Sequence, residues 1–483
     1  MCEFLVCAIL VGVMVLGSVI NVYAQSWEDD PDLHMMVDMR TRLYRSKRTF
    51  GDYRPRKTRL LDMLPNYHAP AKVELSAYGG WLDRKIEATG FFRTENIDGR
   101  WWFVDPNGYL FYATALNSIR WGATKDRSVT APPAFEKRWG DPQAWAGETI
   151  GFLRTNGFNT VGTWSDQLLL KAEPERPQVW TTVVYMMYPF GRRYGATSNE
   201  NNMQFPNHCI PIFHPDFEDF CRARAKENIT DEMIQDPTLL GYFIDNELPW
   251  REDALTRYLS LEQSDINFQK ALEWICKVKG LDVQAVDVDT LKAHLTDEDQ
   301  EQFLGYIAHR YFEIVSRVLR ERDPNHLYLG SRLHGQAIRL RPVFEALGEY
   351  ADVISVNYYH RWTPRVSELK NWRTWSGDKP FVISEWYVKG EDSGYTNTDG
   401  AGGVVKTQVD RGRFYQNFTL GLLESKSCMG WFWHTYRDTK DLPNRSNKGF
   451  VGVQYESFDD LVTMAKEINT QVYPLTSYFD QQR

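Results

Sequence analysis

Eight short apolar segments alternate with segments of helical periodicity along most of the chain. This alternation is typical of parallel βαβ units. Eight such strands favour a closed (β/α)8 barrel over an open doubly wound sheet. No Gly-x-Gly-x-x-Gly motif follows the first strand, which argues against nucleotide binding. The strands are expected at residues 109–119, 159–164, 180–186, 240–247, 327–334, 353–360, 381–387 and 430–436, with helices such as 143–156, 216–235, 404–424 and 458–469.

Two additions to the barrel are expected. Residues 90–113 fit a β-meander, because Asp98-Gly99 and Asn107-Gly108 supply the positive φ angles that tight hairpins need. We expect this meander to lead into the first barrel strand and to close the barrel floor. Residues 252–322 are too long for a single crossover, so they are expected to form a helical insertion after strand four. The expected fold class is therefore α/β, a TIM barrel with an N-terminal meander and a helical insertion.

The first residues resemble an export signal. Residues 4–20 form an apolar run that ends shortly before Val22-Tyr23-Ala24, so we expect a signal peptide, residues 1–24, cleaved after Ala24. The protein would then be secreted, periplasmic or on the outer surface. Because Glu3 precedes the run and no Lys or Arg does, a retained membrane anchor is the alternative.

A basic segment separates this run from the expected barrel. Residues 40–59 contain nine Lys or Arg and one Asp. We expect residues 25–78 to be a solvated arm or linker, with contact to an anionic polymer as the alternative. The catalytic domain is then expected to span residues 79–483.

The composition limits the class of molecule that the protein can bind. A net charge of -8 argues against nucleic acid. The 17 Trp and 25 Tyr exceed what a core needs, and flat rings with a polar edge suit sugar faces. No Cys/His metal spacing or Ca²⁺ loop is present, so no metal or cofactor is expected. Four cysteines follow the apolar run and are expected to be buried thiols, with one disulfide as the alternative: Cys209, Cys221, Cys276 and Cys428.

Two expected strands each end in a glutamate. Strand four runs into Glu247, and strand seven ends at Glu385. In a (β/α)8 barrel the active site lies at the C-terminal ends of the strands. Cleavage of a glycosidic bond needs two carboxyl groups, one to protonate the leaving oxygen and one to attack or to activate water. The sequence therefore predicts Glu247 and Glu385 as a catalytic pair, although either alone is also compatible with a structural ion pair.

The surroundings of this pair resemble the large retaining clan of glycoside hydrolases, clan A. The pair Asn246-Glu247 after strand four and Glu385 after strand seven match the motif of the clan. The resemblance implies that Glu247 is the acid/base and Glu385 the nucleophile. It also implies that Asn246 holds the 2-hydroxyl group of the bound sugar and that Trp433 forms the floor beneath that sugar.

The resemblance to clan A also implies a tyrosine on strand six that donates to the nucleophile. Alternation of side chains favours Tyr359 pointing inward together with Asn357, with Tyr358 as the alternative. In a retaining enzyme the two carboxyl groups lie about 5–5.5 Å apart. Glu247 must be protonated, so we expect a raised pKa from an apolar wall and from the charge of its partner. Hydrogen bonds from strand six are expected to keep Glu385 ionised.

A closer resemblance is to the β-agarases of glycoside hydrolase family 50. It covers the chain from about residue 79 to the end and departs at the N-terminus, where longer family members carry a large β-sandwich that the roughly fifty residues of basic arm and linker are not expected to form. It implies a secreted retaining hydrolase that cuts β-1,4-galactosidic bonds of agarose-type galactans into neoagaro-oligosaccharides, from chain ends. The segments that carry it are 88–111, 158–166, 241–250, 328–335, 383–394 and 446–452.

Two alternatives stay open. One is another retaining β-glycosidase of the clan, such as a β-galactosidase or an enzyme for porphyran or carrageenan. The other is a non-catalytic glycan-binding protein, which is disfavoured because both glutamates and Asn246 are present. Further polar or aromatic residues near strand ends are candidates for sugar contact, or alternatively for orienting a loop: Asn117, Arg120, Trp164, His208, Arg332 and His334. Trp386, beside Glu385, is either a platform for a sugar or a packing residue, and Lys448 either contacts the sugar or is a lysine on the rim.

Overall fold

The computed structural model describes residues 27–43, 49–70, 72–122, 133–171, 177–199, 202–438 and 446–482. The expected signal peptide lies outside the described residues. No helix within the described ranges is long and apolar enough to span a bilayer.

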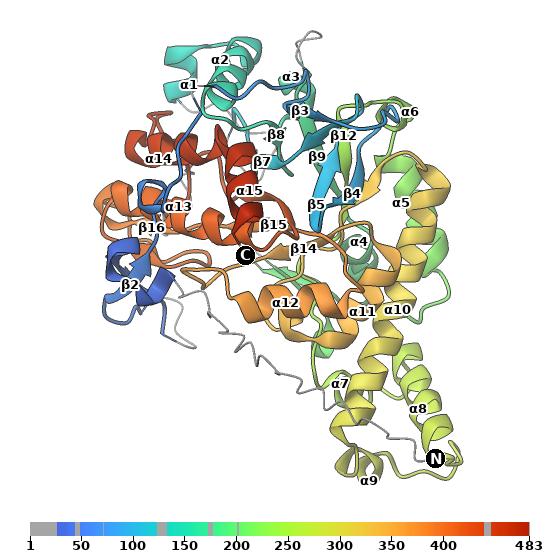
Figure 1. Cartoon of the computed structure of the whole chain (residues 1–483). Coiled ribbons are helices and arrows are strands. Elements are labelled where there is room, and N and C mark those ends of the chain that lie inside the picture. Colours follow the sequence, from blue (N-terminus) through green and yellow to red (C-terminus); the bar gives the residue numbers. More distant parts are fainter. Residues whose placement is uncertain are drawn as a thin grey trace, which may run out of the picture.

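A parallel sheet of eight strands forms the centre of the molecule, with helices around it (Figure 1). The strand order is β13-β12-β9-β8-β7-β18-β15-β14, and a parallel bridge from Leu333 to Val356 joins the two edges. The predicted α/β class and the parallel sheet of a TIM-like barrel are confirmed. The strands are β7 (Ala113–Leu116), β8 (Thr160–Val161), β9 (Val179–Val184), β12 (Leu239–Ile244), β13 (Leu327–Tyr328), β14 (Ile354–Asn357), β15 (Phe381–Trp386) and β18 (Cys428–Trp433).

Helices between the strands form the outer layer. Side-chain caps begin several of them, because Asp141, Thr230, Thr296 and Thr407 each accept a hydrogen bond from a backbone N–H of the first turn. The helix expected at 216–235 is interrupted where Thr230 starts a second one. The helices are α1 (Pro133–Arg138), α2 (Pro142–Thr155), α3 (Gln167–Leu170), α4 (Met187–Gly191), α5 (Phe217–Asn228), α6 (Asp231–Ile234), α10 (Asp297–Arg322), α11 (Arg341–Tyr350), α12 (Val366–Trp375), α13 (Gln408–Glu424), α14 (Asp459–Asn469) and α15 (Val472–Gln481).

An antiparallel sheet precedes the barrel in sequence. It consists of β3 (Trp81–Lys85), β6 (Tyr109–Phe111), β5 (Arg100–Val104) and β4 (Arg93–Ile97), in that order. The segment expected as one strand at 109–119 is therefore divided between β6 and β7. Side chains of this antiparallel sheet, and of Phe92 just before β4, belong to the same buried cluster as barrel residues near the starts of six strands. The cluster fills that end of the barrel. Its members include Phe92, Phe103 and Phe111 together with Val179, Leu240, Leu327, Val353, Val382 and Met429.

Part of the segment expected to be a linker is folded. Strands β1 (Met35–Arg40) and β2 (Arg54–Thr58) pair with each other, and β1 also pairs with β17 (Val404–Val405), which in turn pairs with β16 (Lys389–Gly390). The first two residues of the helix expected at 404–424 are therefore strand. The N-terminal hairpin thus lies against the loop that follows β15.

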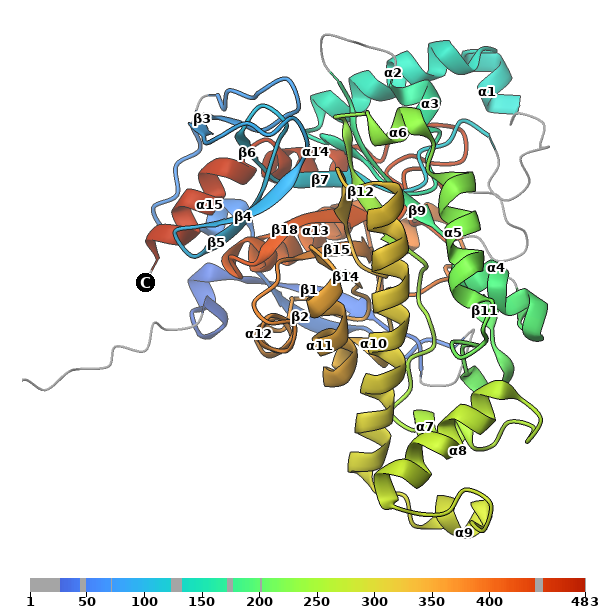
Figure 2. The same ribbon diagram turned by 90° about the vertical axis from the view of Figure 1, so that its right-hand side faces the viewer.

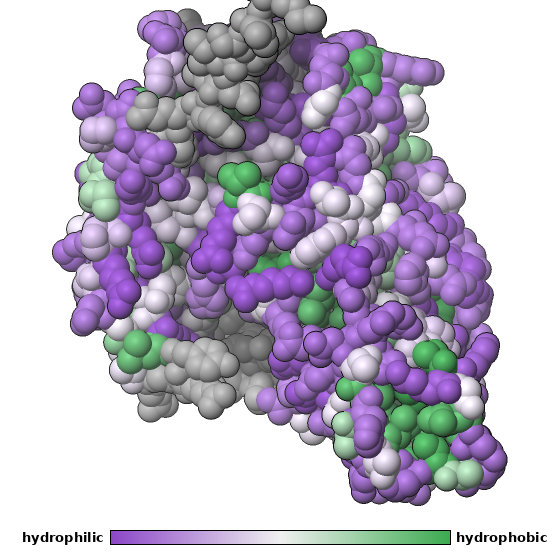
Figure 3. Space-filling model, turned by 60° about the horizontal axis from the view of Figure 1, so that its bottom comes forward, coloured by the Kyte–Doolittle hydropathy of each residue, from purple (hydrophilic) through white to green (hydrophobic). Residues whose placement is uncertain are grey.

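Helices between β12 and β13 project from the barrel (Figures 1 and 2). They are α7 (Ala254–Tyr258), α8 (Ile266–Lys279), α9 (Val288–Ala293) and the first part of α10. Phe303 packs against Tyr258 and Trp274, with ring centroids 5.3 and 5.2 Å apart, which holds the projection together. Hydrophobic side chains gather at its far end in Figure 3, and Val278 and Leu281 of this region are exposed.

Candidate active site

Strands β12 and β15 bring the two glutamates to the same end of the barrel. Glu385 lies within β15, and Glu247 follows β12 after a turn in which Asp245 and Glu247 both have positive φ. The backbone N–H of Glu247 donates to the carbonyl of Arg332 at 3.3 Å, which ties this turn to the segment after β13. The apolar strands thus deliver both carboxyl groups to the C-terminal end, where a (β/α)8 barrel carries its chemistry.

Glu385 has two strong donors. Arg332 donates through Nη2 to Oε1 at 2.5 Å, and the hydroxyl of Tyr359 donates to Oε2 at 2.6 Å. Burial alone raises the pKa of this carboxyl, but the His434 ring, Arg332 and the Tyr359 hydroxyl together lower it to about 2. Burial lowers the pKa of His434 itself to about 4. Arg332 and Tyr359 therefore keep Glu385 ionised near neutral pH.

Glu247 has weaker support for its charge. Its Oε1 accepts from Nδ2 of Asn357 at 2.8 Å and lies 3.9 Å from Nδ1 of His334. Burial raises the pKa of Glu247, and this effect, with the negative charge of Glu385, outweighs the opposing influence of His334. The surroundings therefore shift the two carboxyl groups in opposite directions, raising the pKa of Glu247 and lowering that of Glu385.

Asn246 connects the two carboxyl groups. Its Oδ1 accepts from Nε of Arg332 at 2.7 Å and from Nδ2 of Asn357 at 3.1 Å. The same Arg332 holds Glu385 and the same Asn357 holds Glu247, so one hydrogen-bonded network orients the pair. Nδ2 of Asn246 donates to none of the described residues, which leaves it for a ligand.

A buried aspartate fixes the turn that carries Glu247, and sequence reasoning missed it. Asp245 accepts from the backbone N–H groups of Met186, Met187 and Tyr188 and from the hydroxyl of Tyr311 at 2.6 Å. Burial raises its pKa to about 6. The sequence does contain a signal for this role. Asp245 directly follows an apolar, buried strand, and a buried carboxylate needs hydrogen-bond donors.

Aromatic side chains line the end of β8 and β9. Tyr188 donates to the carbonyl of Asn246 and stacks on Tyr185 with centroids 5.5 Å apart. Trp164 donates to the hydroxyl of Tyr185 at 3.1 Å, and its ring lies 4.6 Å from the guanidinium carbon of Arg332. Trp164 is half-buried and lies beside the network, whereas the tyrosines at 185 and 188 were not predicted.

Three aromatic candidates, Trp433, Trp386 and Tyr358, face away from the hydrogen-bonded network. Trp433 lies outside the barrel, where its Nε1 donates to the carbonyl of Lys448 at 2.7 Å and its ring packs against Trp386 at 4.9 Å. Trp386 is fully buried against Phe418, and the hydroxyl of Tyr358 donates to Glu368 at 2.6 Å. Alternation along a strand explains this, since neighbours of inward-facing residues must face the helices.

His434, rather than Trp433, faces the interior of the barrel end. It lies two residues after Phe432, whose side chain belongs to the cluster inside the barrel, and its ring lies 5.8 Å from that of Trp164 and 6.2 Å from that of Tyr387. Tyr387 in turn contacts Tyr359 at 5.0 Å. The alternation argument that selected Tyr359 on strand six would have selected His434 on strand eight.

Asn117 and Arg120 support neighbouring loops. Nδ2 of Asn117 donates to the carbonyl of Ser384 at 2.8 Å, and its Oδ1 accepts from the backbone N–H of Thr163 at 3.1 Å. Asn117 is fully buried, and Arg120 donates to the carbonyl of Trp164. Asn117 therefore has no surface for a sugar, and its contacts connect β7 to the ends of β8 and β15.

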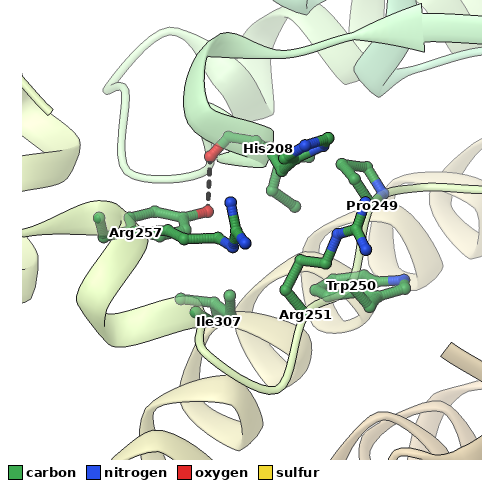
Figure 4. Close-up of a pocket in the computed structure, with 9 residues that line it drawn as sticks. His208, Pro249, Trp250, Arg251, Arg257 and Ile307 are labelled. Carbon is green, nitrogen blue, oxygen red and sulfur yellow. Dashed lines mark hydrogen bonds between the residues drawn. The ribbon is translucent and has the colours of Figure 1, made fainter. Parts of the chain in front are cut away.

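The other predicted residues lie at three places. Nδ1 of His334 donates to the carbonyl of Asn357 at 3.1 Å, and His334 borders Glu247 and Tyr359. Lys448 pairs with Asp399 at 3.1 Å on the rim near Tyr387. His208 is not in the network and instead lines a separate pocket beside Trp250 (Figure 4).

The cysteines and possible metal ligands add no chemistry to this site. The cysteines at 209, 221, 276 and 428 are free and buried. Within the described ranges, no group of three or more His, Cys, Asp or Glu side chains is placed to hold a metal ion.

Comparison with known proteins gives a consistent picture. No family model matches the sequence. β-Agarase B of Vibrio sp. (strain JT0107) is 26% identical over 505 residues, covering 83% of this chain and 50% of that protein. β-Agarase A of the same strain is 24% identical over 477 residues, covering 79% and 46%. The chain thus spans about half the length of these curated relatives.

Solved structures extend the comparison. The structure described as "Crystal structure of BpGH50" is 28% identical, with a TM-score of 0.79 over 93% of this chain and 96% of the other. The agarase AgWH50C is 23% identical, with a TM-score of 0.66 over 83% and 66%. An exo-β-agarase is 22% identical, with a TM-score of 0.68 over 84% and 68%. The chain therefore has the fold of these proteins along nearly its whole described length.

Proposed function

We propose that this chain is a retaining glycoside hydrolase of the family 50 type that cleaves β-1,4-galactosidic bonds in agarose-type galactans. The observation that carries the proposal is the pair Glu247 and Glu385, joined through Asn246, with the pKa of Glu247 raised and that of Glu385 lowered by their surroundings. The likeness to β-agarases supports the substrate class, and no metal is required for two carboxyl groups to do this chemistry.

The first step uses the opposite pKa shifts of the two carboxyl groups. The ionised carboxylate of Glu385 attacks the anomeric carbon while the carboxyl of Glu247 donates its proton to the glycosidic oxygen. The carbon–oxygen bond to the leaving sugar breaks, and a galactosyl ester forms on Glu385. Arg332 and Tyr359 hold the attacking carboxylate in place, which reduces the entropic cost of the attack.

The second step reverses these roles. Glu247, now a carboxylate, takes a proton from water as the oxygen of that water attacks the anomeric carbon and displaces Glu385. Two inversions give net retention. Nδ2 of Asn246 is assigned to the 2-hydroxyl of the sugar, and His434, Trp164 and Tyr387 to the walls around it.

We further propose exo action on chain ends and export through residues 1–24. The test is to incubate the protein with agarose, porphyran, carrageenan and aryl β-galactosides and to size the products. Release of disaccharide alone supports exo action, whereas a ladder of sizes shows endo action. Activity on aryl galactosides alone contradicts the agarase assignment. A β anomer as the first product, seen by NMR, supports retention, and the Glu385→Gln variant is the control.

A further inference from the structure

Helix α10 contacts both ends of the acid/base loop, residues 245–250. At the start of this loop, the hydroxyl of Tyr311 donates to Oδ2 of Asp245 at 2.6 Å. At its end, the ring of Trp250 packs against those of Tyr311 and Phe312, with centroids 5.7 and 5.6 Å apart. All four of these side chains are buried. Two consecutive residues of one helix therefore hold the loop from both sides of the acid/base.

The same helix joins the projection to the barrel (Figure 2). The projection begins after the acid/base loop, with α7, and the chain returns to the barrel along α10. Near the start of α10, Oε1 of Gln300 accepts from two backbone N–H groups of α7 at 2.9 and 3.3 Å, which fastens the outgoing helix to the returning one. Tyr311 and Phe312 therefore close the projection at the loop where it began.

The hydrogen bond from Tyr311 is one of two anchors of the Asp245 carboxylate. The other anchor is a set of backbone N–H groups at residues 186–188, which tie it to the loop after β9. Asp245 and Glu247 both have positive φ. Residues other than glycine adopt this conformation at a cost in free energy, and they keep it only where the surroundings impose it. Loss of the Tyr311 hydroxyl would therefore release one side of a strained turn.

We propose that Tyr311 is a positioning residue for the acid/base: through Asp245 it holds the turn from which Glu247 reaches the glycosidic oxygen. The projection, which α10 closes, thereby contributes to proton donation to the leaving sugar. The inference rests on the function proposed above. Proton transfer needs heavy atoms about 2.6–3.2 Å apart, so a small displacement of the turn weakens it. Attack by Glu385 is affected less, because the donors to that carboxylate lie outside α10.

The chain offers a matched control on the same helix. The hydroxyl of Tyr242, on β12, donates to Oδ2 of Asp323, the residue that follows α10, at 2.7 Å, and both side chains are buried. Tyr311→Phe and Tyr242→Phe therefore each remove one buried hydrogen bond from a tyrosine to an aspartate. Only the first of these bonds reaches the acid/base loop. A role in stability alone predicts the same effect on activity from both variants.

The kinetic test uses aryl glycosides of a neoagaro-oligosaccharide, with leaving groups of graded acidity. A good leaving group needs little proton donation, so we expect Tyr311→Phe to lower kcat about tenfold for a poor leaving group and to change it little for a good one. Tyr242→Phe should leave kcat close to the parent value for both. An equal loss with both leaving groups, or the same selective loss in Tyr242→Phe, overturns the proposal.

A second measurement does not depend on turnover. Amide hydrogen exchange, followed by mass spectrometry, reports how often residues 245–250 open. We expect faster exchange there in Tyr311→Phe than in Tyr242→Phe, since only the first variant loses a hydrogen bond to this loop. Equal exchange in the two variants overturns the proposal. A parent enzyme that cleaves neither galactans nor aryl glycosides contradicts the proposed function instead, and the exchange rates still decide whether Tyr311 holds the turn.

Discussion

The surroundings of Glu385 and Glu247 differ in the kind of donor that each carboxyl receives. Glu385 accepts from the guanidinium of Arg332 and from the phenol of Tyr359, whereas Glu247 accepts from the neutral amide of Asn357. Burial acts on both and favours the neutral form. Of the two carboxyl groups, only Glu385 has a hydrogen bond from a charged donor among the described residues, and its pKa is lowered while that of Glu247 is raised.

One strand serves both carboxyl groups. Asn357, the last residue of β14, and Tyr359 lie two positions apart, so their side chains point to the same side of the sheet. Asn357 reaches Glu247 while Tyr359 reaches Glu385. The difference between the two sites thus depends on a short segment of backbone, and substitutions in it should affect each carboxyl separately.

The largest expected effect comes from removing either carboxyl. Glu385→Ala should reduce kcat on agarose by about 10⁴-fold or more, since no nucleophile remains. Glu247→Ala should reduce kcat by about 10²–10⁴-fold, and less on aryl galactosides with good leaving groups. Added azide should give an α-glycosyl azide with the first variant and a β-glycosyl azide with the second. The reverse pattern contradicts the assigned roles.

The next effect tests the charged donor. Arg332→Met leaves the buried Glu385 without its cation, so we expect about 10²–10³-fold lower kcat and a loss of about 3–5 kcal/mol in unfolding free energy. The pKa of Glu385 should rise, because the group that stabilised its charge is gone, and the acid limb of kcat/KM should move to higher pH. Arg361→Met is the matched control, since Arg361 pairs with Glu368 away from the site. Equal losses of kcat from Arg332→Met and Arg361→Met would show that Arg332 affects only the stability of the fold.

A smaller effect tests Tyr359, the uncharged donor to Glu385. Tyr359→Phe removes one hydrogen bond to a charged oxygen, so we expect about 10–100-fold lower kcat/KM. Tyr358→Phe is the matched variant on the same strand, and it removes a hydrogen bond to Glu368 instead. It should leave kcat/KM close to the parent value. Steady-state kinetics on agarose oligosaccharides check both, and a larger loss from Tyr358→Phe than from Tyr359→Phe contradicts the assignment.

The smallest expected effect is on the pH dependence of kcat/KM. The raised pKa of Glu247 keeps it protonated above the usual range of a carboxyl, and a further rise in pH removes the proton that the leaving group needs. We therefore expect kcat/KM to fall on the basic side as Glu247 ionises. Glu247→Gln has no such group, so its residual activity on an aryl galactoside should lack that limb. A basic limb that persists in this variant assigns it to another residue.

Sequence reasoning located the strands and the two glutamates, because apolar runs that end in one acidic residue are a local signal. It also chose Tyr359 over Tyr358 by alternation. The resemblance to clan A placed Trp433 beneath the sugar, but its ring packs against Trp386 and Tyr415, and the inward position belongs to His434. A tryptophan buried between sheet and α13 looks the same in sequence as one that faces a ligand.

The contacts that could not be predicted join distant parts of the chain. Arg332 serves Glu385 across 53 residues, and Tyr311 of α10 reaches Asp245 across 66 residues. The pairing of β1 with β17 was also missed, because Val404 and Val405 continue smoothly into a helical pattern. Such contacts depend on how the loops fold over the barrel. The periodicity of either segment carries no information about that arrangement.

The pairing of β1 with β17 has a consequence for the order in which the chain folds during synthesis. Residues 35–58 leave the ribosome early, yet their sheet partner is made only when residues 404 and 405 emerge. An isolated two-stranded hairpin is at most marginally stable, so these strands must wait for most of the chain. Tyr53 and Arg40 contact Glu391, a few residues after the nucleophile, and these contacts form equally late. We therefore expect this rim of the active site to be completed only after residues 404 and 405 have emerged, and no nascent chain to be active before then.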